Sequence, residues 1–434
     1  MGDEKYPDTL EEKARAILAY GRLLLASGAG AYRVKYSMAR AAHQLGISRL
    51  EASVTMTDIT VTAWENGRSQ TDFTEQRHVG VNSRRLDVLS EIGTQDLKVR
   101  SVSHLRSLLE QTVKQDRHWG MWTTVFAAAF ACAAFCFLNG GRVVECTTVF
   151  FAAGIGQLVR KLMLKRNYAH FFIWVVCGMV SPLVYMGILS MLASFGHVLQ
   201  LSHQAGLISA ILFLIPGFPL TTAMLDFVRS DFQSALARFS YCVMVLGSAG
   251  LPLWAVTHAT NWDVVGAAPM ALPFALNLSL QILCSFVAAG GFAILFNAAW
   301  KVALLAAGVA ALTNPTRLIL QNYSGIPWQI AVGLAAFVAG LCATFVAWRT
   351  THSRVSLSVP SVVIMIPGVP FYRALVAINE GNLSIALTTI AEVFFVIMAI
   401  GFGLAFSRAV TDRGWLHDRD TTKLADSYLE DRAN

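Results

Sequence analysis

The sequence predicts a polytopic α-helical membrane protein, with ten transmembrane segments arranged as a 5+5 inverted repeat and an N-terminal cytoplasmic α+β domain. Hydrophobic residues make up 55% of the 434 residues and charged residues only 14%, well below the roughly 25% of ordinary soluble proteins. Residues 1–118 balance acids and bases, whereas only six acids occur between residues 119 and 407. The third observation is a helix-breaking motif that occurs twice. Together these features exclude a soluble enzyme, a disordered chain and a coiled coil.

The domain boundaries follow the change in composition. We predict a cytoplasmic α+β domain over residues 1–118, a first membrane repeat over 119–262, a second over 263–407 and a cytoplasmic C-terminal tail over 408–434. The chain begins with acids and no apolar run, so its start does not resemble a signal peptide. The net charge of +7 is explained by basic cytoplasmic loops, so no nucleic-acid partner is predicted.

The N-terminal domain combines helical and strand periodicity around a hairpin signal, the dipeptide Asn66-Gly67. The predicted elements are helices over 10–27 and 31–45, strands over 50–56, 59–65 and 68–74, and helices over 83–92 and 101–114. No nucleotide-binding, metalloprotease or nucleophile-elbow motif occurs in it. Residues 27–30, Ser-Gly-Ala-Gly, precede a helix and could hold an anion, although a helix–helix turn is the favoured interpretation.

The membrane part contains ten apolar segments, most of them close to the roughly 20 residues of a bilayer span. They cover residues 121–138, 146–162, 171–192, 207–215, 235–257, 271–296, 298–312, 328–348, 355–366 and 383–406. The seven cysteines all lie in this part, and the pair Cys132 and Cys136 fits small core residues better than a metal or redox site. No cofactor and no metal site are predicted.

Two of the segments, 207–215 and 355–366, are short and end in the same motif, I-P-G-x-P. The motif starts at Ile215 and again at Ile366, and each copy closes the fourth of five segments. Matching positions indicate a duplication. Because five is odd, the second copy should insert upside down relative to the first. Basic residues are concentrated on one set of loops, which places both chain ends in the cytoplasm.

The motif should break a helix within the membrane, since proline removes a backbone donor and glycine permits unusual conformations. In transporters, paired interrupted helices at corresponding positions mark the substrate site, and the alternative is a kink that only shapes packing. The predicted substrate pathway consists of Pro216, Gly217, Pro219, Pro367, Gly368, Pro370, Asn277 and Gln281. The last two share one helical face and either bind substrate or hold helices together.

The acids of the membrane part are few enough to consider singly. Glu392 lies near the middle of a long apolar segment, where burial would favour its protonated form and suit proton coupling better than a structural role. Four charged residues after the first break form either a gate or a solvated helix end, and one after the second break is added to this candidate gate: Asp226, Arg229, Asp231, Arg238 and Arg373. Glu145 and Asp263 are predicted to be solvated in outer loops.

At this point the sequence resembles the threonine/serine exporter family. The stretch from Ser27 to Val34, with Met38 and Gly46 beyond it, resembles the signature of that family's cytoplasmic domain, as do Val81-Asn82 and Leu86-Asp87. The two P-G-x-P helices resemble its paired membrane repeats. The resemblance implies a secondary transporter that fuses two subunits, which are separate proteins in some bacteria and are there associated with succinate export. Lys35 departs from the family, in which glutamate is common after the Arg-Val pair.

The function predicted is proton-coupled export of threonine and serine across a bacterial inner membrane, with Glu392 as the coupling residue and the N-terminal domain as a gate. A dicarboxylate exporter of the same architecture is the nearest alternative, with Arg229, Arg238 and Arg373 as the cationic partners of a dianion. A membrane-anchored hydrolase and a passive channel are the more distant hypotheses. The predicted partners are a small-molecule substrate, protons and membrane lipid, and small-residue helix faces permit a homo-oligomer.

Overall fold

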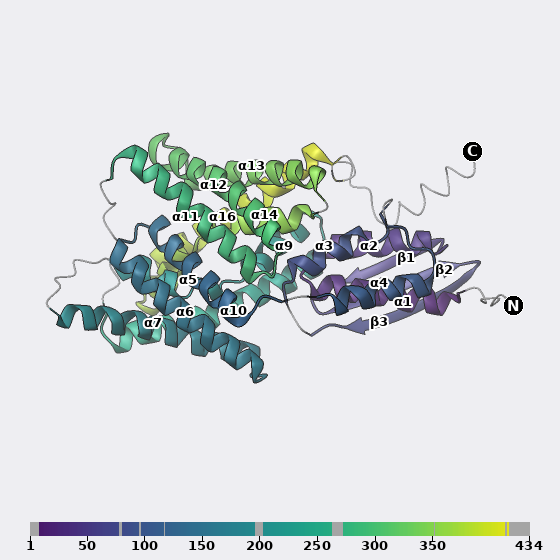
Figure 1. Ribbon diagram of the computed structural model, residues 1–434, viewed down its shortest axis with the longest axis horizontal. Coiled ribbons are helices and arrows are strands. Elements are labelled where there is room, and N and C mark those ends of the chain that lie inside the picture. The colour runs from purple at the N-terminus through teal and green to yellow at the C-terminus, as the bar shows by residue number, and fades with distance from the viewer. Residues whose placement is uncertain are drawn as a thin grey trace.

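The computed structural model describes residues 8–415, apart from 78–79, 95–96, 117, 196–202, 263–271, 351 and 413–414. Two parts are distinguished in Figure 1: an N-terminal lobe of residues 8–116 with a small sheet, and a helical bundle of residues 118–412. The lobe lies against one end of the bundle, and helices α3 and α9 lie close to the junction.

The lobe is built from four helices and a three-stranded antiparallel sheet with the order β1-β2-β3. Its elements are α1 (Leu10–Ala26), α2 (Ala31–Gln44), β1 (Arg49–Val54), β2 (Asp58–Glu65), β3 (Arg68–Glu75), α3 (Ser83–Glu91) and α4 (Val102–Lys114). All seven lie close to their predicted positions. Asn66 and Gly67 both have positive φ, 51° and 76°, as a tight hairpin turn between right-twisted strands requires.

The bundle contains helices and their connecting turns, and no strand, within its described residues. Its elements are α5 (Met121–Leu138), α6 (Val143–Lys165), α7 (His170–Ser194), α8 (His203–Ala210), η1 (Leu212–Leu214), α9 (Gly217–Val228), α10 (Phe232–Ala259), α11 (Phe274–Leu295), α12 (Trp300–Tyr323), α13 (Trp328–Arg349), α14 (Arg354–Val363), α15 (Gly368–Asn379) and α16 (Leu383–Thr411). Eight of the helices in the described ranges are long and apolar enough to cross a membrane. Helices α14 and α15 together would make a ninth span, bent by 53°. The chain is a polytopic membrane protein.

The structure breaks the helices at both motifs, as predicted, and corrects the end of one other segment. The helices of the segments expected at 207–215 and 355–366 stop at or just before their proline–glycine motifs, and a second helix, α9 or α15, begins at the motif glycine. Proline is tolerated at the start of a helix, where its missing N–H has no intrahelical partner. The segment predicted to end at residue 312 continues as α12 through Pro315 to Tyr323.

Helix contacts repeat in the two halves of the bundle. In the first half α5 packs on α6, α6 on α7, α7 on α10 and α9 on α10. In the second half α11 packs on α12, α12 on α13, α13 on α16 and α15 on α16. The halves meet where α5 contacts α11 and where α9 contacts α16. The same order of neighbours therefore occurs twice.

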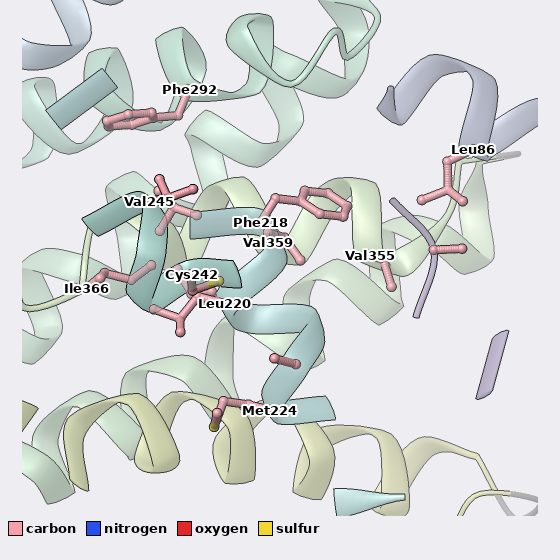
Figure 2. Packing of buried hydrophobic residues seen from close by; sticks show 14 of the residues in the cluster. Leu86, Phe218, Leu220, Met224, Cys242, Val245, Phe292, Val355, Val359 and Ile366 are labelled. Carbon is pink, nitrogen blue, oxygen red and sulfur yellow. The ribbon is translucent and has the colours of Figure 1, made fainter. Parts of the chain in front are cut away.

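One continuous apolar core joins the lobe to the bundle. Figure 2 shows part of it, from Leu86 of α3, past Val355 of α14 and Phe218 of α9, to Ile366, the first residue of the second motif. Phe218 is fully buried, and its ring lies 5.5 Å from that of Phe296 at the end of α11. The lobe is therefore packed onto the helices that carry the two motifs.

Candidate functional site

The two I-P-G-x-P motifs adopt nearly the same backbone. Pro216 is the N-cap of α9 with φ −80° and ψ 57°, and Pro367 is the N-cap of α15 with φ −78° and ψ 69°. Each helix that follows has 12 residues. In both motifs the glycine N–H donates to the carbonyl oxygen two residues before it, at 2.9 Å. Equal backbone geometry is expected of duplicated sequence segments.

The two breaks pack directly against each other. A methyl group added at Gly217 would lie 2.9 Å from Cγ2 of Val363, just before the second break. A methyl group added at Gly368 would lie 3.2 Å from Cδ2 of Leu212, just before the first break. The relation is reciprocal, because each glycine touches the residue five positions before the other glycine. In this conformation the breaks close on one another through apolar contacts.

The remaining pathway residues lie in different surroundings. Pro219 is buried, whereas Pro370 is half-buried. Asn277 and Gln281 are half-buried on α11, and neither side chain has a hydrogen bond within the described part of the chain. Sequence reasoning missed a buried polar pair formed by Asn314 and Ser285. Nδ2 of Asn314 donates to Oγ of Ser285 at 2.8 Å. An Asn-Pro step inside an apolar run was the signal available for it.

The glycine-rich loop of residues 27–30 lies on the first break. A methyl group at Gly28 would be 3.3 Å from the ring of Phe218, the variable residue of the first motif. The N–H of Ala31, at the start of α2, donates to Oδ1 of Asp226 at 3.0 Å. The loop is thus both the helix–helix turn and the anion site considered from the sequence, and its anion is a carboxylate of the same chain. Gly30 is required because a methyl group there would lie 2.7 Å from the same oxygen.

Asp226 and Arg238 form a buried ion pair, at 3.2 Å from Nε to Oδ2, with 2% and 3% of each residue exposed. Ser234 donates its hydroxyl to Oδ2 of Asp226 at 3.0 Å. Nη2 of Arg238 donates to the carbonyl oxygen of Ala29 at 2.7 Å. Of the two alternatives considered from the sequence, a solvated helix end is wrong for these two residues, because both are enclosed where α9, α10 and the lobe meet.

The other predicted gate residues divide between two places. Asp231 forms an ion pair with Lys35 of α2, so the lysine that departs from the family pattern meets a carboxylate. Arg229 lies over the rings of Tyr32 and Trp415, at 4.1 and 4.8 Å. Arg373 is exposed on α15, and the structure does not bring it to the cluster around α2.

A second carboxylate joins the lobe to the other broken helix. Asp87 of α3 accepts hydrogen bonds from the N–H of Ser353 at 3.1 Å and from the hydroxyl of Ser356 at 2.6 Å. Both lie at the start of α14, where free N–H groups and the helix dipole favour an anion. A carboxylate of the bundle therefore sits at the start of a lobe helix, and a carboxylate of the lobe sits at the start of a bundle helix.

His352 adds a titratable group to this second contact, because its Nδ1 lies 3.5 Å from Oδ2 of Asp87. The hydrogen bond to Asp87 raises the pKa of His352 above its ordinary value of 6.5. Since folding raises this pKa, the contact should stabilise the folded protein below pH 6.5 and lose that contribution as the pH rises through the raised pKa.

Thermal unfolding of wild type and His352→Gln between about pH 5 and pH 8 measures this effect. We expect wild type to be more stable by up to about 1 kcal/mol at the acid end and the two proteins to converge at the alkaline end. A difference that does not change with pH would contradict a titrating contact.

The acids of the bundle are placed differently from expectation. Glu392 is exposed on the surface of α16 rather than enclosed by other helices, and it has no hydrogen-bond or ion-pair partner in the described part of the chain. Glu145 was expected in a solvated loop, but it is fully buried in the first turn of α6. For both residues, exposure of the side chain depends on how its helix is rotated about its axis relative to neighbouring helices. Asp263 lies outside the described residues.

Two family models match this chain, one over its N-terminal part and one over its C-terminal part. Residues 15–259 match the family described as "Putative threonine/serine exporter", and residues 281–410 match the family described as "Threonine/Serine exporter, ThrE". The chain is 25% identical over 230 residues to the probable succinate transporter subunit YjjP of Escherichia coli, covering 52% of this chain and 86% of that protein. It is 21% identical over 406 residues to the threonine/serine exporter of Corynebacterium glutamicum, covering 91% of this chain and 81% of that protein. No solved structure matches the chain. Because the first match alone covers more than half of the chain, the protein belongs to the threonine/serine exporter family of transporters.

Proposed function

We propose that this protein exports threonine and serine, or chemically similar small solutes, across a bacterial inner membrane in exchange for protons. The observation that carries the proposal is the reciprocal contact of the two helix breaks. Interrupted helices at corresponding positions are where secondary transporters bind substrate. Substrate would enter by separating Gly217 and Gly368 from the apolar residues that now cover them.

The architecture proposed for this activity is ten transmembrane segments in two inverted repeats of five, with residues 119–262 and 263–407 as the repeats. The repeated order of helix neighbours supports it, as does the start of α10 and α16 at the same interval after each motif glycine. A subunit-sized relative that covers about half of this chain also favours a fusion of two units.

The lobe is proposed to be a cytoplasmic domain, residues 1–118, that gates the inner end of the pathway. Its glycine-rich loop touches Phe218 of the first motif, and its Asp87 holds the start of α14. Separation of the breaks would therefore strain both contacts. The basic residues at the helix ends support the cytoplasmic placement of the lobe and of the C-terminal tail.

A dicarboxylate is the second candidate substrate, favoured by the similarity to YjjP. The arginines proposed for a dianion are not equally suited to it. Arg238 is already paired with Asp226, and Arg229 lies against two aromatic rings. A dicarboxylate would have to displace these contacts or use Arg373.

Counterflow in proteoliposomes tests the proposal. Vesicles containing the purified chain are preloaded with unlabelled threonine, serine or succinate, and entry of the matching labelled compound is followed with and without a pH gradient. We expect threonine and serine to exchange and the gradient to accelerate their accumulation. Exchange of succinate alone would move the substrate to a dicarboxylate, and absence of all exchange would contradict the proposed activity.

Substitution of single acids tests which carboxylate couples transport to protons. Glu392 is the residue predicted from the sequence, and its exposed position on α16 gives it no described contact with either break. A glutamine at this position mimics the protonated side chain. If Glu392 couples transport to protons, Glu392→Gln should retain exchange and lose its response to the gradient.

A further inference from the structure

Glu145 carries a carboxyl group that is enclosed in the bundle. None of its surface is exposed. Its Oε2 accepts the N–H of Arg142 at 2.9 Å, and its Oε1 faces the hydroxyl of Tyr185 at 3.5 Å. Within the described residues no Lys, Arg or His side chain lies within ion-pair distance of it. The first turn of α6, which carries Glu145, lies a full helix length from the lobe, because α5 starts next to Asn297 and Ala298 at the lobe.

Tyr185 connects this carboxyl group to the first broken helix. Tyr185 belongs to α7 and is fully buried. A methyl group added at Gly206 of α8 would lie 2.0 Å from its hydroxyl oxygen, so the backbone of α8 covers the hydroxyl. Helix α8 leads into the first break, and its Ile208 lies within 4.0 Å of a methyl group placed at Gly368. A movement of α8 would therefore uncover Tyr185 and Glu145 and disturb the contact between the breaks.

We propose that Glu145 and Tyr185 form a proton-dependent latch at the end of the bundle away from the lobe, which closes under α8 only while Glu145 carries a proton. This inference rests on the proposed exchange for protons. A carboxylate moved from water into an apolar interior without a cation is strongly destabilised, whereas a neutral carboxylic acid is tolerated. Closure thus requires one proton, taken from the solution at this end and bound to a carboxylate oxygen.

Closure involves a single protonation of Glu145 and no other bond change. The carboxylate and one proton give the neutral acid on closure, and dissociation returns both to the solution when the site opens again. The other ionisable groups around the carboxyl are Cys136 of α5, Cys146 of α6 and Tyr185 of α7, with Arg142 as the cation of the preceding turn. Ser209 of α8 contacts Cys136 and brings no charge. The two thiols and the phenol are neutral in water at neutral pH, so Glu145 is the group of this cluster whose negative charge closure has to remove.

The variant Glu145→Gln distinguishes a proton-dependent role of Glu145 from a purely structural role as the cap of α6. Glutamine keeps an oxygen that can accept the N–H of Arg142, so α6 keeps its cap, but it cannot release a proton. We expect this variant to exchange substrate at the wild-type rate and to lose acceleration by a pH gradient. Glu380→Gln, a glutamine substitution of the exposed acid at the end of α15, is the matched control and should keep its response to the gradient. An unchanged gradient response in Glu145→Gln would overturn the inference.

Infrared spectroscopy provides a second readout that does not depend on transport. A buried protonated carboxyl group has a carbonyl stretching band, which should be present in wild type and missing from Glu145→Gln. Tyr185→Phe, which removes only the hydroxyl, should shift this band without abolishing it. A band that remains in Glu145→Gln and disappears in Glu392→Gln would contradict the latch, whatever the exchange assay shows. If wild type exchanges none of the tested solutes, the proposed function fails while the band still decides the protonation of Glu145.

Discussion

Replacing Arg238 with methionine should destabilise the protein by about 3–5 kcal/mol, because it leaves Asp226 buried without its cation. The guanidinium now lies 3.2 Å from the carboxylate and also donates to the carbonyl oxygen of Ala29. Its removal should therefore loosen the glycine-rich loop as well as α9. Thermal unfolding measures the first effect, and hydrogen exchange of the amides of residues 27–31 measures the second.

Two further variants make this result interpretable. Lys35→Met breaks the partly exposed ion pair with Asp231 and should change stability by no more than about 1 kcal/mol. The double variant Asp226→Leu/Arg238→Met replaces the buried pair with apolar side chains and should recover part of the lost stability. It should not restore protection of the loop, since α2 still lacks the carboxylate at its N-terminus. If Arg238→Met and Lys35→Met lowered stability by the same amount, burial of the Asp226–Arg238 pair would not be the cause of a large loss.

The second large effect should come from Gly217→Ala, which we expect to destabilise the closed bundle by about 1–3 kcal/mol and to impair substrate exchange. The added methyl group would lie 2.9 Å from Val363, whose branched side chain cannot move away by rotating a distant bond. Gly368→Ala should be milder, because the nearest atoms are the chain ends of Leu212 and Ile215 at 3.2 and 3.3 Å.

A glycine elsewhere in the bundle supplies the control for this substitution. Gly247 of α10 has no atom within 4 Å of an added methyl group, so Gly247→Ala should be neutral or stabilise the helix by up to about 1 kcal/mol. Val363→Ala makes room at the break and should partly rescue Gly217→Ala in both unfolding and counterflow. Absence of rescue would mean that the contact between the breaks does not cause the defect.

Local sequence signals predicted the elements of this protein well. The lobe's strands follow from alternation and from Asn66-Gly67, and the helices from apolar spacing. The positions of both breaks follow from proline and glycine, whose backbone restrictions act at the residue itself. The predicted segments left out the helices that follow each break, because a proline that stops one helix is also compatible with the first residues of the next.

The environment of the charged residues was harder to predict. Helix α16 is apolar on every face, so its sequence did not indicate that Glu392 is exposed. The pairing of Ala31 with Asp226 joins residues 195 positions apart, and no local pattern encodes such a partner. Asp87 stands out in the sequence only as part of a family signature, and its place at the start of α14 came from the structure.

The sequence by itself determined that this is a membrane protein with a duplicated helix break, and it pointed to the transporter family. Hydropathy and backbone stereochemistry carry that information, since both act within a few residues. Only the tertiary structure decided that the two breaks touch, that the lobe's glycine-rich loop covers the first, and that Glu145 is the enclosed acid. Those facts depend on how each helix is rotated against its neighbours. That rotation is set by packing among segments far apart in the chain, in which many similar apolar faces compete.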